Sequence, residues 1–110
     1  MIVEMRTYVL QPGQQTTFLR LMEQEGILIE RPVLGRLLGF YSTEIGVLNQ
    51  VIHLWGYDSF EERQRRRGLL AANVEWLAFL PKVIPMIRDM QNQLLHPAPF
   101  AAVPHSTGSV

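Results

Sequence analysis

The chain has 110 residues, of which 47% are hydrophobic and 18% charged, as in a soluble globular protein with one domain. Ten basic residues balance ten acidic ones, which argues against a nucleic-acid-binding surface because such surfaces carry net positive charge. The sequence lacks cysteine, which excludes disulfides and thiolate chemistry. It shows neither a signal peptide nor the ~20 successive apolar residues of a membrane span. We therefore predict a cytoplasmic protein that binds neither nucleic acid nor membranes.

The first half of the chain predicts a strand, a helix and a second strand. Residues 2–10 alternate between two sets of side chains, as a strand with one face on a core does. After a Pro-Gly pair, apolar residues recur at helical spacing over residues 14–29, and Pro32 and Gly35 are predicted to end this helix. Residues 37–45 are rich in aromatic and β-branched side chains and predict the second strand.

The second half predicts a strand, further helices and a last strand. Residues 50–57 alternate again and follow a short hairpin connection. Ser59 and Glu62 have the spacing of a capping box, which predicts the start of a helix. Asn73 is a second helix cap, and the helical pattern after it is limited by prolines. Residues 86–95 form a polar last strand.

The element order predicts an α+β, ferredoxin-like β-α-β-β-α-β domain over residues 1–97. Its four strands form an antiparallel sheet, and its two main helices lie on one face of that sheet. Residues 98–110 are rich in proline and small side chains and are predicted to be an extended tail. The second sheet face is left uncovered, so we look there for function.

We expect the uncovered face to carry the mixed set of strand side chains, because the aliphatic set suits the helix side. The mixed set consists of Glu4, Arg6, Tyr8, His53, Trp55 and Tyr57. Monomers seldom expose such a patch. Either a second copy of the chain covers it and closes a barrel, or nucleic-acid bases stack on it as in the RNA-recognition fold. The third strand lacks the basic opening of that fold, so the sequence favours a homodimer.

Four segments are similar to the NIPSNAP family. EMRTYVLQPG (4–13) resembles its opening strand, LGFYSTEIG (38–46) and NQVIHLWGYDSFEER (49–63) its central hairpin and second helix start, and LLHPAPF (94–100) its end. The resemblance implies a dimeric α/β barrel, a superfamily that includes small monooxygenases, isomerases and haem-handling enzymes. It implies no settled reaction, so whether this chain is an enzyme stays open.

His53 and Tyr8 are the candidate catalytic residues. A histidine pKa near ~6.5 suits acid–base catalysis at neutral pH, and a tyrosine hydroxyl both donates and accepts hydrogen bonds. Alternatively, His53 fills the barrel while hydrogen-bonded to Glu4 or Asn49.

Arg6, Glu4, Trp55 and Tyr57 are the candidate ligand-binding residues. Arginine binds anionic or carbonyl groups through its fork of donors, and the aromatic rings would form a wall for a flat ligand. Alternatively, Arg6 pairs with Glu4 or Glu44 at the dimer interface, and Trp55 and Tyr57 belong to the dimer core.

Two further groups are predicted to carry no chemistry. His53, His96 and His105 fit no metal-ligand spacing, so we expect no metal, and no motif indicates a cofactor. The arginine run, Arg63 with residues 65–67, follows two glutamates at helical spacing. Pairs such as Glu62–Arg66 and Glu61–Arg65 therefore predict a solvated face.

Our first hypothesis is a homodimeric barrel that binds a small organic molecule, with proton transfer as the reaction to test. The alternative is a non-catalytic protein–protein interaction module whose barrel is purely structural. An enclosed cavity that Tyr8 and His53 face would favour the first.

Overall fold

Four antiparallel strands form one sheet in the order β2-β3-β1-β4, so that β1 and β3 lie at its centre. The strands are β1 (Ile2–Leu10), β2 (Arg36–Ser42), β3 (Gln50–Tyr57) and β4 (Ile87–Leu95). The computed structural model describes residues 1–101, and most of the predicted tail over residues 98–110 lies outside them. The strand order and helix placement confirm the predicted ferredoxin-like α+β fold.

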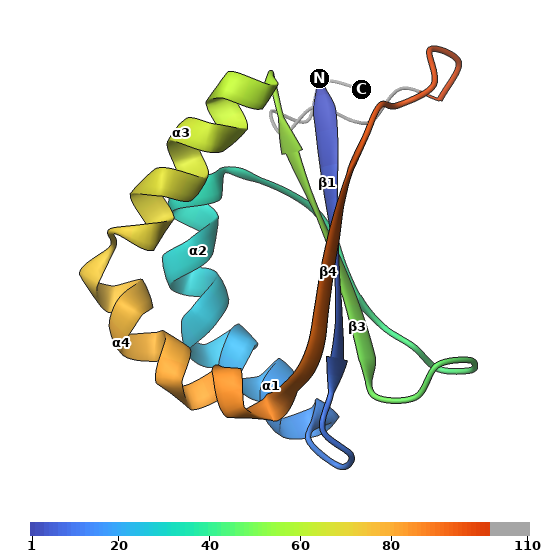
Figure 1. Ribbon diagram of the computed structural model, residues 1–110, viewed down its shortest axis with the longest axis vertical. Helices are drawn as coiled ribbons and strands as arrows, with labels where there is room; N and C mark the ends of the chain where they lie inside the picture. Colours follow the sequence, from blue (N-terminus) through green and yellow to red (C-terminus); the bar gives the residue numbers. More distant parts are fainter. Residues whose placement is uncertain (102–110) are drawn as a thin grey trace.

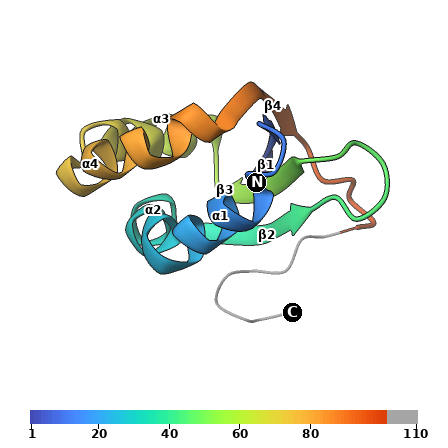
Figure 2. The same ribbon diagram turned by 90° about the horizontal axis from the view of Figure 1, so that it is seen from below.

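All helices cover the same face of the sheet (Figure 1). They are α1 (Gln15–Leu21), a π-helical turn (Met22–Gly26), α2 (Ile27–Leu34), α3 (Phe60–Ala71), α4 (Val74–Val83) and a 3₁₀ turn (Ile84–Met86). Figure 2 shows them as two neighbouring pairs, α1 with α2 and α3 with α4, beside the sheet. Among residues 1–101, no single helix is long and apolar enough to cross a membrane. The segments Phe60–Ala71 and Val74–Met86 reach the necessary length and apolar composition only when taken together, and they are bent by 79° relative to each other.

The predicted caps at Ser59 and Asn73 are present, but only the Ser59 half of the capping box is among the hydrogen bonds of residues 1–101, because the Glu62 side chain binds Arg65 and Arg66 instead. The Ser59 hydroxyl accepts a hydrogen bond from the Glu62 amide at 3.1 Å, and the Asn73 side chain accepts one from the Trp76 amide at 2.9 Å. Each satisfies an amide of a first helical turn.

The prediction that Pro32 would end the first helix is wrong, because α2 continues through it to Leu34. Pro81 likewise lies inside α4, which continues to Val83. Leu34 and Val83 are both buried, and this burial stabilises the last turn of each helix against the backbone hydrogen bond that its proline removes.

The core lies between the helices and the sheet, and it contains the side chains predicted for the uncovered face. Trp55 and Tyr57 pack with Leu34 and Leu70 from the helices. Tyr8 packs in a second cluster with helix residues, among them Phe18, Met22 and Phe79. Glu4 and His53 are 0% and 2% exposed.

The predicted orientation of the mixed set is therefore wrong. Alternation correctly groups the side chains that share a face, but it does not say which face the helices cover. Here the helices supply polar partners of their own, which is why an ionisable set is stable beneath them. The outer face carries the other set, including half-buried Met5, Ile52 and Leu54.

The β2–β3 connection is longer than predicted, because β2 ends at Ser42 and β3 begins at Gln50. Within it Gly46 has φ +130° and Asn49 has φ +59°. Both are left-handed backbone conformations that these two residue types tolerate best. The tip exposes Ile45 and Leu48.

Candidate functional site

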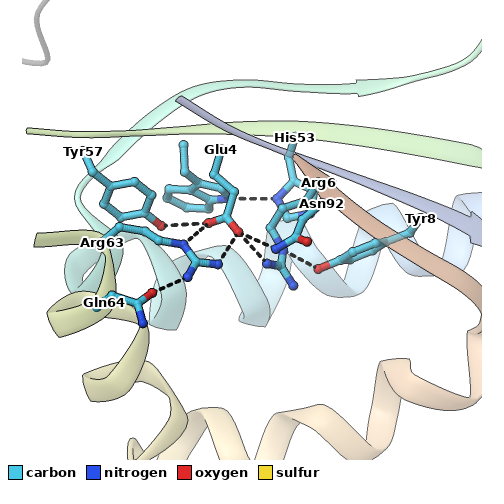
Figure 3. A network of polar contacts seen from close by, with 9 residues as sticks. Glu4, Arg6, Tyr8, His53, Tyr57, Arg63, Gln64 and Asn92 are labelled. Carbon is cyan, nitrogen blue, oxygen red and sulfur yellow. Dashed lines mark hydrogen bonds and ion pairs between the residues drawn. The ribbon is translucent and has the colours of Figure 1, made fainter. Parts of the chain in front are cut away.

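The carboxylate of Glu4, on the central strand β1, is the hub of a buried polar network (Figure 3). Its Oε2 atom accepts hydrogen bonds from Arg63 on α3 at 2.7 Å and from Arg6 at 3.0 Å. Asn92 on β4 donates to the same atom at 2.8 Å. The Glu4–Arg6 pair predicted as an alternative is thus present, but it lies under the helices.

Burial alone would raise the pKa of the Glu4 carboxyl group, but these donors outweigh burial. Hydrogen bonds from Arg63 and Asn92 and the charge of Arg6 lower this pKa to about 2. The Tyr57 hydroxyl, which donates to Glu4 at 3.5 Å, has its pKa raised to about 12 by burial and by the Glu4 charge. Glu4 is therefore ionised, and its bonds to Tyr57 and Arg63 link the sheet to α3.

His53 lies beside this network on β3, and its two ring nitrogens have different surroundings. The indole N–H of Trp55 donates to Nδ1 at 2.8 Å, and the ring of Phe40 stacks on the imidazole at 4.7 Å. Nε2 is buried and has no hydrogen-bond partner among residues 1–101. The predicted alternative bonds to Glu4 or Asn49 are absent from the bonds formed by these residues.

Next to His53, between the sheet and the helices, is a cavity of about 230 Å³, called the inner cavity below. Its polar wall consists of Arg6, Tyr8, Glu30, His53 and Arg67. Its apolar wall includes Phe18, Met22, Phe40, Trp76, Val83 and Ile87. Such a combination of apolar walls and a few convergent polar groups is typical of a small-molecule site.

Three buried polar atoms of this wall have no hydrogen-bond partner among residues 1–101. They are Oε1 of Glu30, Nε2 of His53 and one terminal nitrogen of Arg67. Leaving such a group unpaired costs about 1–3 kcal/mol, and buried polar groups in folded proteins are usually paired. That all three line one cavity marks it as a site for a polar partner.

Burial and neighbouring charges set the protonation states in the cavity. Burial raises the pKa of the Glu30 carboxyl group to about 7, against the opposing charges of Arg67 and Arg6. Burial, with the charges of Arg6 and Arg67, lowers the pKa of His53 to about 3, so its imidazole is neutral at pH 7. Because Nδ1 accepts from Trp55, we place the single ring proton on Nε2, which makes this atom a donor into the cavity.

Tyr8 also faces the inner cavity. Its hydroxyl accepts a hydrogen bond from Arg6 at 2.9 Å, which leaves the hydroxyl proton for another acceptor. Burial raises the pKa of this hydroxyl, so it stays protonated at neutral pH. His53 and Tyr8, predicted together as catalytic, thus lie on one cavity wall with ring centroids 5.0 Å apart.

A larger groove of about 490 Å³ lies outside the inner cavity, against α1, the π-helical turn and β2. It is lined mostly by apolar side chains and by the surface charges Arg20 and Glu23. It shares two wall residues, Met22 and Phe40, with the inner cavity. We favour the inner cavity as the site because the unpaired polar atoms lie there.

The arginine run is divided between two surroundings, so its prediction as a solvated face is half correct. Arg65 and Arg66 pair with Glu62 at 2.6 and 2.8 Å, which includes the predicted Glu62–Arg66 pair. Arg63 instead binds Glu4, and Arg67 lines the inner cavity. In the part of the chain that the structure describes, no group of His, Asp and Glu is placed to hold a metal ion.

Sequence reasoning missed Glu30 and Arg67 as site residues, although a signal existed for each. Glu30 has the same helical phase as Gly26 and Leu34, which are both buried. A carboxylate four residues from a buried position on either side indicates an inward-facing acid. Arg67 follows Arg63 by four residues and so lies on the same side of α3.

The geometry defines a ferredoxin-like α+β protein with a cavity between its sheet and its helices. The fold is shared with a putative antibiotic biosynthesis monooxygenase from Nitrosomonas europaea, which aligns with a TM-score of 0.65 over 87% of this chain and 97% of that one. The two sequences are 6% identical, so this likeness concerns the fold alone.

The family is defined by closer matches. The NIPSNAP family model matches residues 3–102. A NIPSNAP-like domain protein from Burkholderia xenovorans is 50% identical, with a TM-score of 0.89 over 92% of this chain and 88% of that one. Human NipSnap homolog 3A is 32% identical over 99 residues, which are 88% of this chain but 39% of that protein. The chain belongs to the NIPSNAP family and spans about two fifths of the length of that human relative.

Proposed function

We propose that this protein binds a small organic molecule in the inner cavity, with an oxygen-bearing end placed against Glu30, His53 and Arg67. The observation that carries the proposal is the convergence of three buried, unpaired polar atoms on one cavity. The volume of about 230 Å³ equals roughly eight water molecules at ~30 Å³ each. A compact ligand with an apolar body and one polar end fits these walls.

We further propose that Glu30 acts as a general acid or base, which donates a proton to the bound molecule or accepts one from it. A carboxyl group with a pKa of about 7 both takes up and releases protons near neutral pH, as a general acid or base must. His53, with a pKa of about 3, is a weak base. In this proposal His53 and Tyr8 keep their place in the site as hydrogen-bond donors, and Arg6 holds Tyr8.

We also propose a homodimer, formed through the outer face of the sheet. Met5, Ile52 and Leu54 on the central strands and Tyr41 on β2, which is 55% exposed, give this face an apolar surface. A second copy would remove it from water. The six residues first assigned to this interface lie in the core instead, and they play no part in it.

Native mass spectrometry of the full chain purified from its own host tests ligand and dimer together. We expect a dimer that carries a small molecule, released on denaturation. An Arg67→Met variant should lose the molecule, whereas Arg65→Met, on the exposed side of the same helix, should retain it. A wild-type chain without any bound molecule, also after exposure to a host metabolite extract, would contradict ligand binding.

A further inference from the structure

The polar wall of the inner cavity has more positive than negative charge. Arg6 and Arg63 share the single carboxylate of Glu4. Arg67 makes no ion pair with any residue of the described range, and neither does Glu30. The wall itself has two guanidinium groups, of Arg6 and Arg67, and one carboxyl group, of Glu30. The adjoining Glu4–Arg63 pair adds one charge of each sign, so the excess is one positive charge, and protonation of Glu30 raises it to two.

The groups that the wall offers to a ligand are mainly donors. Arg67 presents a terminal N–H group, His53 presents its Nε2 proton, and Tyr8 has a hydroxyl proton to donate. Glu30, once protonated, adds another donor. Donors under excess positive charge and away from water bind an anion, and arginine suits a carboxylate because of its paired N–H groups.

We propose, resting on the ligand-binding function above, that the ligand is a small apolar monocarboxylate bound by Arg67 and His53, and that Glu30 is protonated in the complex. Binding thus brings a proton into the cavity together with the anion. The proton stays on Glu30, next to the ligand, so binding itself prepares the acid for the transfer proposed above.

The charges around Glu30 support this coupling. From α3 the Arg67 charge favours the ionised form of Glu30, as does Arg6 from β1, whereas Glu4 on β1 opposes it. Tyr8 and His53 are neutral at pH 7 and line the same cavity. A bound carboxylate would place one negative charge near Glu30, and this charge offsets the effect of Arg67. The change raises the pKa of Glu30 above its value of about 7 in the free protein.

Isothermal titration calorimetry with two matched probes tests the proposal. The probes are 3-phenylpropionate, an apolar carboxylate, and 3-phenylpropanol, its neutral counterpart. At pH 6.5 we expect the carboxylate to bind at least tenfold more tightly. Its affinity should fall by about tenfold per pH unit above the pKa of free Glu30, because each complex then takes up one proton. Titration in two buffers of different ionisation enthalpy should give close to one proton taken up at pH 8.

Three variants separate the parts of the proposal. Glu30→Gln keeps the shape and a donor but does not titrate, so its affinity for 3-phenylpropionate should not change between pH 6.5 and pH 8.5. Arg67→Met should weaken binding at least tenfold, and Arg65→Met should leave it unchanged.

The outcomes distinguish this inference from the proposed function. Equal binding of 3-phenylpropanol, or a pH dependence that persists in Glu30→Gln, would overturn the carboxylate inference while small-molecule binding stands. So would a neutral or cationic molecule found bound in the native mass spectrum. If neither probe binds and the purified protein holds no molecule, both the inference and the proposed function fail.

Discussion

The indole N–H of Trp55 donates a hydrogen bond to Nδ1 of His53 over 2.8 Å, between two fully buried side chains on one strand. This bond determines which nitrogen of His53 carries the proton, and hence that the histidine donates rather than accepts in the inner cavity. Its donor, Trp55, lies outside that cavity wall, so the polarity of the site depends on a residue that would not touch the ligand.

Replacing Trp55 by Phe should therefore change the tautomer of the His53 imidazole and lower the stability of the protein. The variant leaves Nδ1 buried without its donor, and we expect the free energy of unfolding to fall by about 1–3 kcal/mol. ¹⁵N NMR of the imidazole should show a single Nε2–H tautomer in the wild type and a mixture in Trp55→Phe. Trp76→Phe, on the opposite cavity wall, should keep the single tautomer. A single unchanged tautomer in Trp55→Phe would contradict this role.

Glu4 should be among the most stability-critical residues of the chain. Glu4→Gln leaves the Arg6 and Arg63 guanidinium groups without their carboxylate, which typically costs about 3–5 kcal/mol for a buried pair. Urea unfolding at pH 7 measures the loss. Glu44→Gln, on the exposed hairpin, is the control and should change little.

The same residue predicts a loss of stability in acid. Its pKa is about 2 in the folded protein against 4.5 ordinarily, so its contribution is complete above pH 4.5 and lost as the pH falls towards 2. The difference in unfolding free energy between wild type and Glu4→Gln should shrink over that range by about 3 kcal/mol. A constant difference would show that Glu4 is not ionised in this network.

Glu30 should behave in the opposite way. Its folded pKa of about 7 exceeds the ordinary 4.5, so the folded state holds a proton that the unfolded state loses, and stability falls as the pH rises from 4.5 through 7. Glu30→Gln removes this penalty and should be more stable than the wild type at pH 8 by roughly 2–3 kcal/mol. Near pH 4.5 the two proteins should unfold alike. Urea unfolding at both pH values measures the effect, and a destabilised variant at pH 8 would contradict it.

The proposed dimer predicts that one charge on the outer sheet face separates the subunits. Ile52 lies opposite Thr7 at the centre of that face, and Ile52→Asp would place a charge in an apolar interface. Sedimentation at micromolar concentration should give a dimer for the wild type and a folded monomer for the variant. Leu69→Asp alters a residue on α3 that is 52% exposed, and it should remain dimeric. A monomeric wild-type protein in this experiment would contradict the proposed dimer.

Local features of the fold were predictable from the sequence, and those that depend on packing across layers were not. The caps at Ser59 and Asn73 act within one helical turn, so their residue types alone predict them. The side of the sheet on which Trp55 lies depends on where helices distant in sequence pack. The composition of the site was the hardest feature to predict for this reason, because Glu30 and Arg67 join it from two different helices. The catalytic and binding roles of the predicted residues and the cytoplasmic location stay predictions.

Gly26, which ends the π-helical turn, has no room for a side chain, because a Cβ atom there would lie 2.8 Å from the Phe79 ring. The turn also holds one residue more than a regular helical turn would. Deleting one residue from the π-helical turn would rotate α2 by about 100° about the helix axis relative to α1. Glu30 would then leave the cavity, although no side chain of α2 had been changed. The acid of the site thus depends on the number of residues between two helices, and a search for related sites should compare that length as well as the residues themselves.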